Sequence, residues 1–195
     1  MRRVAKPEVQ SPRSKVQGPK SLRARPVVVV SACLLGERCR YDGKAIFAPA
    51  VLSLGRLVTF VPVCPETGIG LEVPRLPIRL VETRPGIRLM QTLTGKDLTR
   101  KMRSFSRRFL AGHKVDGFIL KARSPSCAVS DAPVYDELGQ ETGLELQGVF
   151  ADEALNRSLT ALMEDEECLR DPGRMAGFMK RLFEPGPEPK RRRSR

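Results

Sequence analysis

The sequence lacks several features that identify common classes of protein. It contains no apolar run near twenty residues, the length that a helix needs to span a bilayer, so we expect no membrane-spanning segment. It has one histidine, His113, and no cysteines in a C-x-x-C spacing, which excludes zinc ribbons and the ferredoxin-type cluster run. His113 follows a predicted helix, where a cation suits the helix dipole. Any sulfur-based site must therefore use cysteines that lie far apart in the sequence.

Positive charge is concentrated at the two ends of the chain, which has 195 residues and a formal net charge of +13. Residues 1–25 carry eight Lys or Arg against one acid, and residues 184–195 carry five against two. Both segments are rich in Pro, Ser and Gly, so we predict disordered basic arms around one α/β domain at residues 26–183. The arms are either solubilising tails or contacts for the phosphates of RNA.

The five cysteines are expected to be reduced. A basic leader followed by VVVV and Cys33 has the outline of a lipoprotein signal. The apolar run of about six residues is shorter than the seven or more of a signal core. We therefore predict a cytoplasmic protein, in which cysteines bind metals or act in catalysis more often than they form disulfides.

Apolar periodicity predicts a small parallel sheet of the Rossmann type. Unbroken apolar runs without alternation, typical of buried parallel strands, lie at residues 26–32, 58–63 and 117–120. The pattern predicts helices at residues 48–57, 96–112 (with Thr94 as its cap), 152–163 and 172–183, a hairpin at 79–92, and loops at 33–46 and 121–134. The alternation of strands and helices indicates a single compact α/β domain with helices on both faces of the sheet.

Four cysteines lie where these apolar runs give way to loops. Cys33 and Cys39 follow the first run, Cys64 follows the second and Cys127 follows the third. Ligands of open α/β sheets bind outside the carboxyl ends of the strands, so this placement predicts one site lined with sulfur. The alternative is that each cysteine is a small buried hydrophobic residue.

The sequence around these cysteines resembles a bacterial family catalogued as domain of unknown function 523, which includes the 2-thiouracil desulfidases. The matching blocks are SACLLG-x-x-CRYDGK, VCPE-x-x-x-G followed by PR, G-x-D-x-T and LK-x-R-SPSC. They occupy residues 31–44, 63–75, 95–99 and 120–127, and the resemblance extends over roughly residues 27–155.

The resemblance implies a [4Fe–4S] cluster that is held by three cysteines and has one iron without a protein ligand. Because each strand end supplies one thiol, we assign Cys33, Cys64 and Cys127 as its ligands. Cys39 is either a catalytic thiol or the third ligand in place of one of these. The open iron is a Lewis acid suited to the sulfur of a thiocarbonyl, so the implied reaction releases sulfide from a thiolated pyrimidine without redox change.

Four further residues are candidates for catalysis or substrate binding. Glu66, two residues after Cys64, is placed to activate water or carry a proton; its alternative is a solvated loop carboxylate. Ser124 and Ser126 could bind the pyrimidine or cluster sulfides, or cap a turn. Asp42 either binds the polar edge of the base or fixes its own loop.

Three functions therefore remain open. The favoured function is an iron–sulfur desulfidase that acts on a free thiopyrimidine or on a thiolated nucleoside in RNA. The second is a cluster- or metal-binding accessory or sensor protein without catalysis, and the third is an RNA-binding module that uses the basic arms.

Overall fold

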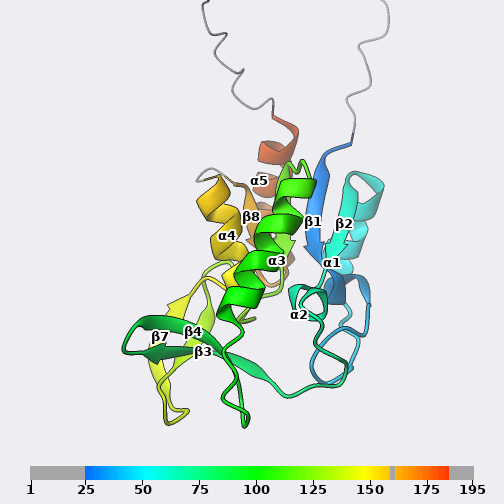
Figure 1. The fold of residues 1–195 in the computed structure, drawn as a ribbon. Helices are drawn as coiled ribbons and strands as arrows, with labels where there is room; N and C mark the ends of the chain where they lie inside the picture. The colour runs from blue at the N-terminus through cyan, green and yellow to red at the C-terminus, as the bar shows by residue number, and fades with distance from the viewer. Residues whose placement is uncertain (1–24, 159–160, 185–195) are drawn as a thin grey trace, which may run out of the picture.

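The structure of the protein is a computed structural model that describes residues 25–158 and 161–184 (Figure 1). The predicted basic arms at residues 1–25 and 184–195 lie almost entirely outside the described residues. The strands are β1 (Val27–Ser31), β2 (Thr59–Val63), β3 (Ile78–Thr83), β4 (Gly86–Gln91), β5 (Gly117–Leu120), β6 (Ala132–Tyr135), β7 (Glu141–Leu146) and β8 (Met163–Asp165). The α-helices are α1 (Pro49–Ser53), α2 (Pro65–Gly68), α3 (Thr99–Gly112), α4 (Val149–Arg157) and α5 (Pro172–Phe183). Short 3₁₀ turns η1 (Ala32–Leu35), η2 (Leu54–Arg56) and η3 (Cys168–Arg170) complete these elements.

The first sheet is parallel and has the strand order β2-β1-β5-β8. The three strands predicted from apolar runs are therefore adjacent, with β1 in the middle. Pro62, in the edge strand β2, opposes Val30 of β1, and an edge strand tolerates a residue that donates no ladder hydrogen bond. The ends of β1 and β5 are also joined by a side chain, because the Lys121 amide donates to the Ser31 hydroxyl at 3.0 Å.

Helices cover both faces of this sheet, as predicted (Figure 1). Val28 and Val30 point to one side, where they pack with residues of α1 and α5, including Val51 and Phe178. Val29 points to the other side and packs with residues of α3 and α4, including Phe150. Because successive side chains of a strand alternate between faces, the three consecutive valines Val28, Val29 and Val30 serve both cores. The predicted α/β fold class is confirmed.

A second sheet of four strands, in the order β4-β3-β6-β7, is the main feature that the sequence analysis missed. The hairpin predicted at residues 79–92 is present as β3 and β4. However, β6 begins at Ala132, within the loop predicted at residues 121–134, and it pairs parallel with β3 and antiparallel with β7. The core of this sheet packs against Leu98 and Met102, at the start of α3.

Two helix boundaries also differ from prediction. Helix α3 begins at Thr99 rather than Lys96, and Asp97 rather than Thr94 accepts a bond from the first turn, from the Thr99 amide at 2.8 Å. The helix predicted at residues 152–163 runs instead from 149 to 157, and Met163 begins β8. Among the described residues, none of the helices is long and apolar enough to cross a membrane.

The start of α4 docks on the segment that contains Cys127. The first amide groups of a helix have no partner within it. Here the Val149 amide donates to the Pro125 carbonyl at 3.1 Å, and the Phe150 amide donates to the Ser126 carbonyl at 2.8 Å. Gly148 makes this approach possible, because a Cβ on it would lie 2.4 Å from the Ser126 carbonyl carbon.

We expect Gly148→Ala to destabilise the protein and to displace the Cys127 segment. Overpacking of this kind costs about 1–3 kcal/mol, and the atoms that must move belong to backbone. The matched control is Gly177→Ala in α5, where an added Cβ meets nothing within 4 Å; this change should stabilise by roughly 0.5–1 kcal/mol. Urea unfolding of both variants measures the difference, and equal stability of the two would contradict the proposed contact.

Candidate functional site

A pocket of about 390 Å³ lies at the carboxyl ends of β1, β2 and β5, and all four predicted cysteines line it. Cys33 lies in η1 directly after β1, and Cys64 directly follows β2. Cys127 follows β5 after a short loop, and Cys39 comes from the loop after η1. The parallel arrangement thus brings together thiols that are up to 94 residues apart in the chain, from Cys33 to Cys127. The five cysteines of the chain are free thiols.

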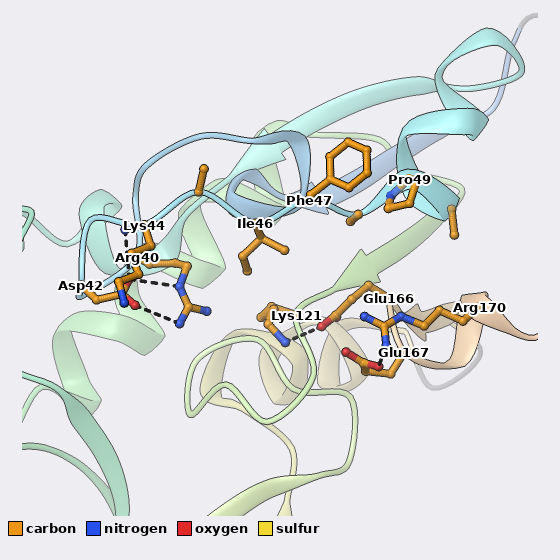
Figure 2. A pocket seen from close by; sticks show the side chains of 13 residues that line it. Arg40, Asp42, Lys44, Ile46, Phe47, Pro49, Lys121, Glu166, Glu167 and Arg170 are labelled. Atoms are coloured by element: carbon orange, nitrogen blue, oxygen red, sulfur yellow. Dashed lines mark hydrogen bonds and ion pairs between the residues drawn. The ribbon is translucent and has the colours of Figure 1, made fainter.

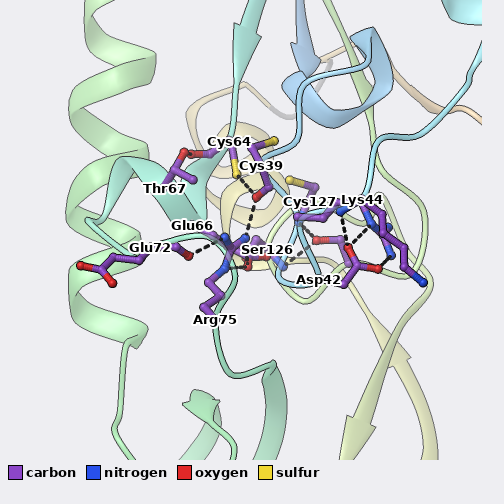
Figure 3. A network of polar contacts seen from close by, with 12 residues as sticks. Cys39, Asp42, Lys44, Cys64, Glu66, Thr67, Glu72, Arg75, Ser126 and Cys127 are labelled. Atoms are coloured by element: carbon purple, nitrogen blue, oxygen red, sulfur yellow. Dashed lines mark hydrogen bonds and ion pairs between the residues drawn. The ribbon is translucent and has the colours of Figure 1, made fainter.

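The thiols contact one another and the surrounding backbone (Figure 3). The Cys64 thiol donates to the Cys39 carbonyl at 3.6 Å. Contact with the Cys33 sulfur, together with burial, raises the pKa of Cys39 to about 11. Contact with Cys39 and burial also raise the pKa of Cys64 well above its ordinary value. Burial raises the pKa of Cys127 to about 12, against opposing hydrogen bonds with Ser31 and Ser124.

Glu66 is held at the edge of this pocket by a network that reaches three segments of the chain (Figure 3). Cys64 is the N-cap of α2, and Pro65 at the first helical position starts the turn that carries Glu66. Arg75 donates to one carboxylate oxygen, Oε2, from Nε at 2.9 Å and from Nη2 at 2.6 Å. The Ser126 hydroxyl donates to Oε1 at 3.1 Å. Glu66 is therefore oriented from both sides.

Arg75 also fixes the loop of Cys39. Its Nη2 donates to the Cys39 carbonyl at 2.9 Å, and its side chain is only 5% exposed. Because a guanidinium has several donors in a rigid plane, one side chain connects the carboxylate to the thiol loop. Arg75 belongs to one of the blocks on which the family resemblance rests, but its hydrogen bonds to Glu66 and to the Cys39 carbonyl leave no signal in the sequence.

The two predicted serines have different environments. The Ser124 hydroxyl accepts hydrogen bonds from the amides of Ser126 and Cys127, at 3.3 and 3.1 Å, while Ser124 also lines the pocket. It therefore caps the turn before Cys127, and it also forms a hydrogen bond with the Cys127 thiol. Ser126 is completely buried, is not among the pocket-lining residues, and directs its hydroxyl to Glu66.

Asp42 lies in an adjoining pocket of about 420 Å³, which shares Arg40 and Lys121 with the thiol pocket (Figure 2). Its Oδ1 accepts from Arg40 Nε and from the Lys44 amide, both at 3.1 Å. The hydrogen bond with Arg40 lowers the pKa of Asp42. These contacts fix the loop, which is one of the two roles considered for Asp42, and none of them reaches the thiols.

Lys121 provides positive charge at the boundary of the two pockets (Figure 2). It forms an ion pair with Glu166, which is 4% exposed. The second oxygen of Glu166 accepts from the Ala122 amide at 2.8 Å. The segment after β5 is therefore anchored by a buried carboxylate that the sequence analysis did not identify, because Glu166 lies 45 residues further along the chain.

The donor set fits a cluster better than a single ion. Within the part of the chain that the structure describes, no three His, Cys, Asp or Glu side chains are arranged to hold one metal ion. In a cubane, each protein thiolate binds a different iron, so the ligands need not converge on one point. Four free thiols around one pocket are consistent with that requirement.

Comparisons with known proteins show which family the chain resembles. The model of the family described as 2-thiouracil desulfurase matches residues 28–167. The uncharacterized protein YbbK of Bacillus subtilis (strain 168) is 30% identical over 109 residues, which cover 52% of this chain and 72% of YbbK. The solved structure of the [4Fe–4S]-dependent thiouracil desulfidase TudS superposes with a TM-score of 0.56 at 26% identity, and the match covers 78% of this chain and 99% of that protein. The chain therefore belongs to the 2-thiouracil desulfurase family.

Proposed function

We propose that this protein is a desulfidase that removes the sulfur of a thiolated pyrimidine as sulfide, using a [4Fe–4S] cluster. The observation that carries the proposal is the pocket in which four free thiols surround a space beside an oriented carboxylate. Family membership and the likeness to a [4Fe–4S]-dependent desulfidase support it. Free thiols are also the state expected in a reducing cytoplasm, where we place the protein.

Cys33, Cys64 and Cys127 are the proposed cluster ligands, one from the end of each adjacent strand. When bound, a cluster with three protein ligands supplies a thiophilic, Lewis-acidic iron that can polarise a thiocarbonyl. Cys39 remains in the pocket as a fourth thiol, and we propose that it acts on the substrate rather than as a ligand.

Glu66 is the proposed general base. Arg75 and Ser126 orient its side chain at the pocket edge, where it can accept a proton from a water molecule that attacks the carbon of the C=S group. The new C–O bond replaces the C–S bond, and the sulfur leaves with its electron pair as hydrosulfide. The sum of the step is a thiocarbonyl plus water giving a carbonyl plus hydrogen sulfide, with no net oxidation or reduction.

Ser124 and Asp42 complete the proposed site. Ser124 lines the pocket with a hydroxyl that can donate to the pyrimidine, whereas Ser126 positions Glu66. Asp42 shapes the neighbouring pocket through Arg40, where it can bind the polar edge of a substrate that extends beyond the thiols. A free thiopyrimidine and a thiolated nucleoside both remain candidate substrates.

Anaerobic purification should give about four irons and comparable acid-labile sulfide per chain, as a cubane requires. We expect Cys33→Ser, Cys64→Ser and Cys127→Ser each to lose most of this iron, because each removes one ligand. Cys39→Ser should retain the iron and lose sulfide release. Iron analysis together with the visible absorption spectrum provides the measurement.

Cys168→Ser is the matched control for these variants. Cys168 lies at the start of η3 and contacts Asp165 rather than the pocket, so its replacement should leave the iron content unchanged. Full iron in any of the three ligand variants, with iron lost in Cys39→Ser, would show that the ligand set is wrong.

Glu66→Gln should retain the cluster but release sulfide from 2-thiouracil and 4-thiouridine at least about 100-fold more slowly, the usual contribution of a general base. Glutamine keeps the shape of the side chain and removes its ability to accept a proton. Glu72→Gln is the control, because Glu72 is an exposed carboxylate on the same segment whose side chain points away from the network (Figure 3). If Glu66→Gln released sulfide at the wild-type rate, Glu66 would not be the base. Absence of sulfide release from the iron-loaded wild type would favour the non-catalytic accessory function.

A further inference from the structure

Helix α3 carries an unusual excess of positive charge. Its sequence, TRKMRSFSRRFLAG, contains five Lys or Arg and no acidic residue. Its opposite face buries Met102 and Leu110 against the two sheets. The charge is therefore concentrated on the face that points to solvent, and it belongs to the folded domain rather than to the basic arms.

Two of these five cations form ion pairs with other described residues. Arg103 donates to Glu153 at 2.7 Å and lies 3.0 Å from Asp152, and Arg107 donates to Glu153 at 2.8 Å. Glu153 is 5% exposed, so these contacts neutralise a buried carboxylate of α4. Arg103 and Arg107 thus have a structural function in joining the two helices.

The other three cations, Arg100, Lys101 and Arg108, are exposed and form no ion pair with any described residue. We call them the α3 basic face. Arg108 makes one contact, to the Ser104 hydroxyl at 3.3 Å, on the same side of the helix. Arg100 and Arg108 are eight residues apart, which corresponds to about 12 Å along a helix.

The position of two of these cations is unfavourable for the helix itself. Arg100 and Lys101 lie in the first turn of α3, where the helix dipole disfavours positive charge. An external anion bound to these side chains would compensate for this effect.

We propose that the α3 basic face binds the phosphate backbone of RNA. A row of separate cations on a convex helix surface fits a chain of phosphates and encloses no small molecule. The exposed positions of α3 carry no large apolar side chain, which a helix needs in order to bury one face in a membrane. The choice of RNA among polyanions rests on the proposed function, because thiolated pyrimidines occur in RNA.

The α3 basic face lies next to α2, the helix that carries the proposed general base Glu66. Helices α2 and α3 pack side by side (Figure 1). Their contact is so close that a Cβ on Gly68 would lie 2.3 Å from the Phe105 ring, and Lys101 Nζ lies 3.8 Å from the position of a Cβ on Gly70. An RNA held on α3 would therefore lie alongside the segment that contains Glu66.

The test compares the full-length protein with a triple variant, Arg100→Gln, Lys101→Gln and Arg108→Gln. Fluorescence anisotropy measures binding of an unmodified transcribed tRNA between about 50 and 200 mM salt. We expect the variant to bind more weakly. The slope of the logarithm of the binding constant against the logarithm of the salt concentration should fall in magnitude by about two to three, roughly one for each lost phosphate contact. Because this RNA contains no thiolated base, the result is independent of desulfidase activity.

The matched control is Arg56→Gln, Arg84→Gln and Lys180→Gln, which removes the same net charge from three exposed positions on separate elements. It should bind RNA with the wild-type salt dependence. The proposal is overturned if wild type does not bind the tRNA, if the α3 variant binds it as wild type does, or if the control loses as much. Equal α3-dependent binding to duplex DNA or to anionic phospholipid vesicles would also overturn the choice of RNA.

The variant also separates this proposal from the proposed function. Iron content and sulfide release from free 2-thiouracil should stay at wild-type levels, because none of the three residues contacts the thiol pocket. Loss of RNA binding with retained turnover supports the proposal. If the wild-type protein bound RNA through α3 but released no sulfide, the proposed desulfidase activity would be wrong. The proposal for the α3 basic face would still hold.

Discussion

The site depends on the parallel register of β2, β1 and β5. Because the three strands run in the same direction and are adjacent, their carboxyl ends meet at one edge. Ser31 at the end of β1 is opposite Val63, one residue before Cys64. A shift of one residue in either pairing would move every side chain of the strand to the opposite face. The hydrophobic cores on both sides of β1 therefore also fix the positions of the thiols.

The surroundings of the pocket are held by hydrogen bonds that cross between elements. The Cys127 segment is attached to the start of α4 through two backbone carbonyls, and Lys121 at the end of β5 is paired with the buried Glu166. Arg75 joins Glu66 to the Cys39 loop. Buried ion pairs contribute little net stability on average, but loss of one partner is costly. Their role here is to fix geometry: each holds a loop that carries a residue of the site.

The sequence predicted the parts of the fold that leave an apolar pattern. The runs at β1 and β5 were recognisable because both faces of these strands are buried or partly buried. The run at β2 was recognisable because it is mostly apolar, although Thr59 and Pro62 are exposed. Strand β7 was not recognisable, because its six residues are exposed or nearly so and show no alternation. Strand β6 has only four residues, one of them Pro133. The second sheet therefore depends on tertiary contacts rather than on local preference.

The residues of the candidate site could likewise be predicted only in part. The cysteines could be grouped from their positions at strand ends, and Glu66 from its distance to Cys64. The contacts that orient Glu66 could not be predicted, because Ser126 is 60 residues away and its hydroxyl direction depends on how the Cys127 segment docks on α4. Patterns in a sequence indicate which elements end together, whereas the direction of each side chain follows from packing.

Anomalous X-ray scattering at the iron edge, from crystals of the anaerobically purified protein, would locate each iron atom relative to the four thiols. We expect one compact group of iron peaks inside the pocket, bonded to the sulfurs of Cys33, Cys64 and Cys127, with one iron that has no protein ligand. Iron bound elsewhere on the chain, or a cluster in which Cys39 supplies a fourth protein bond, would contradict this expectation.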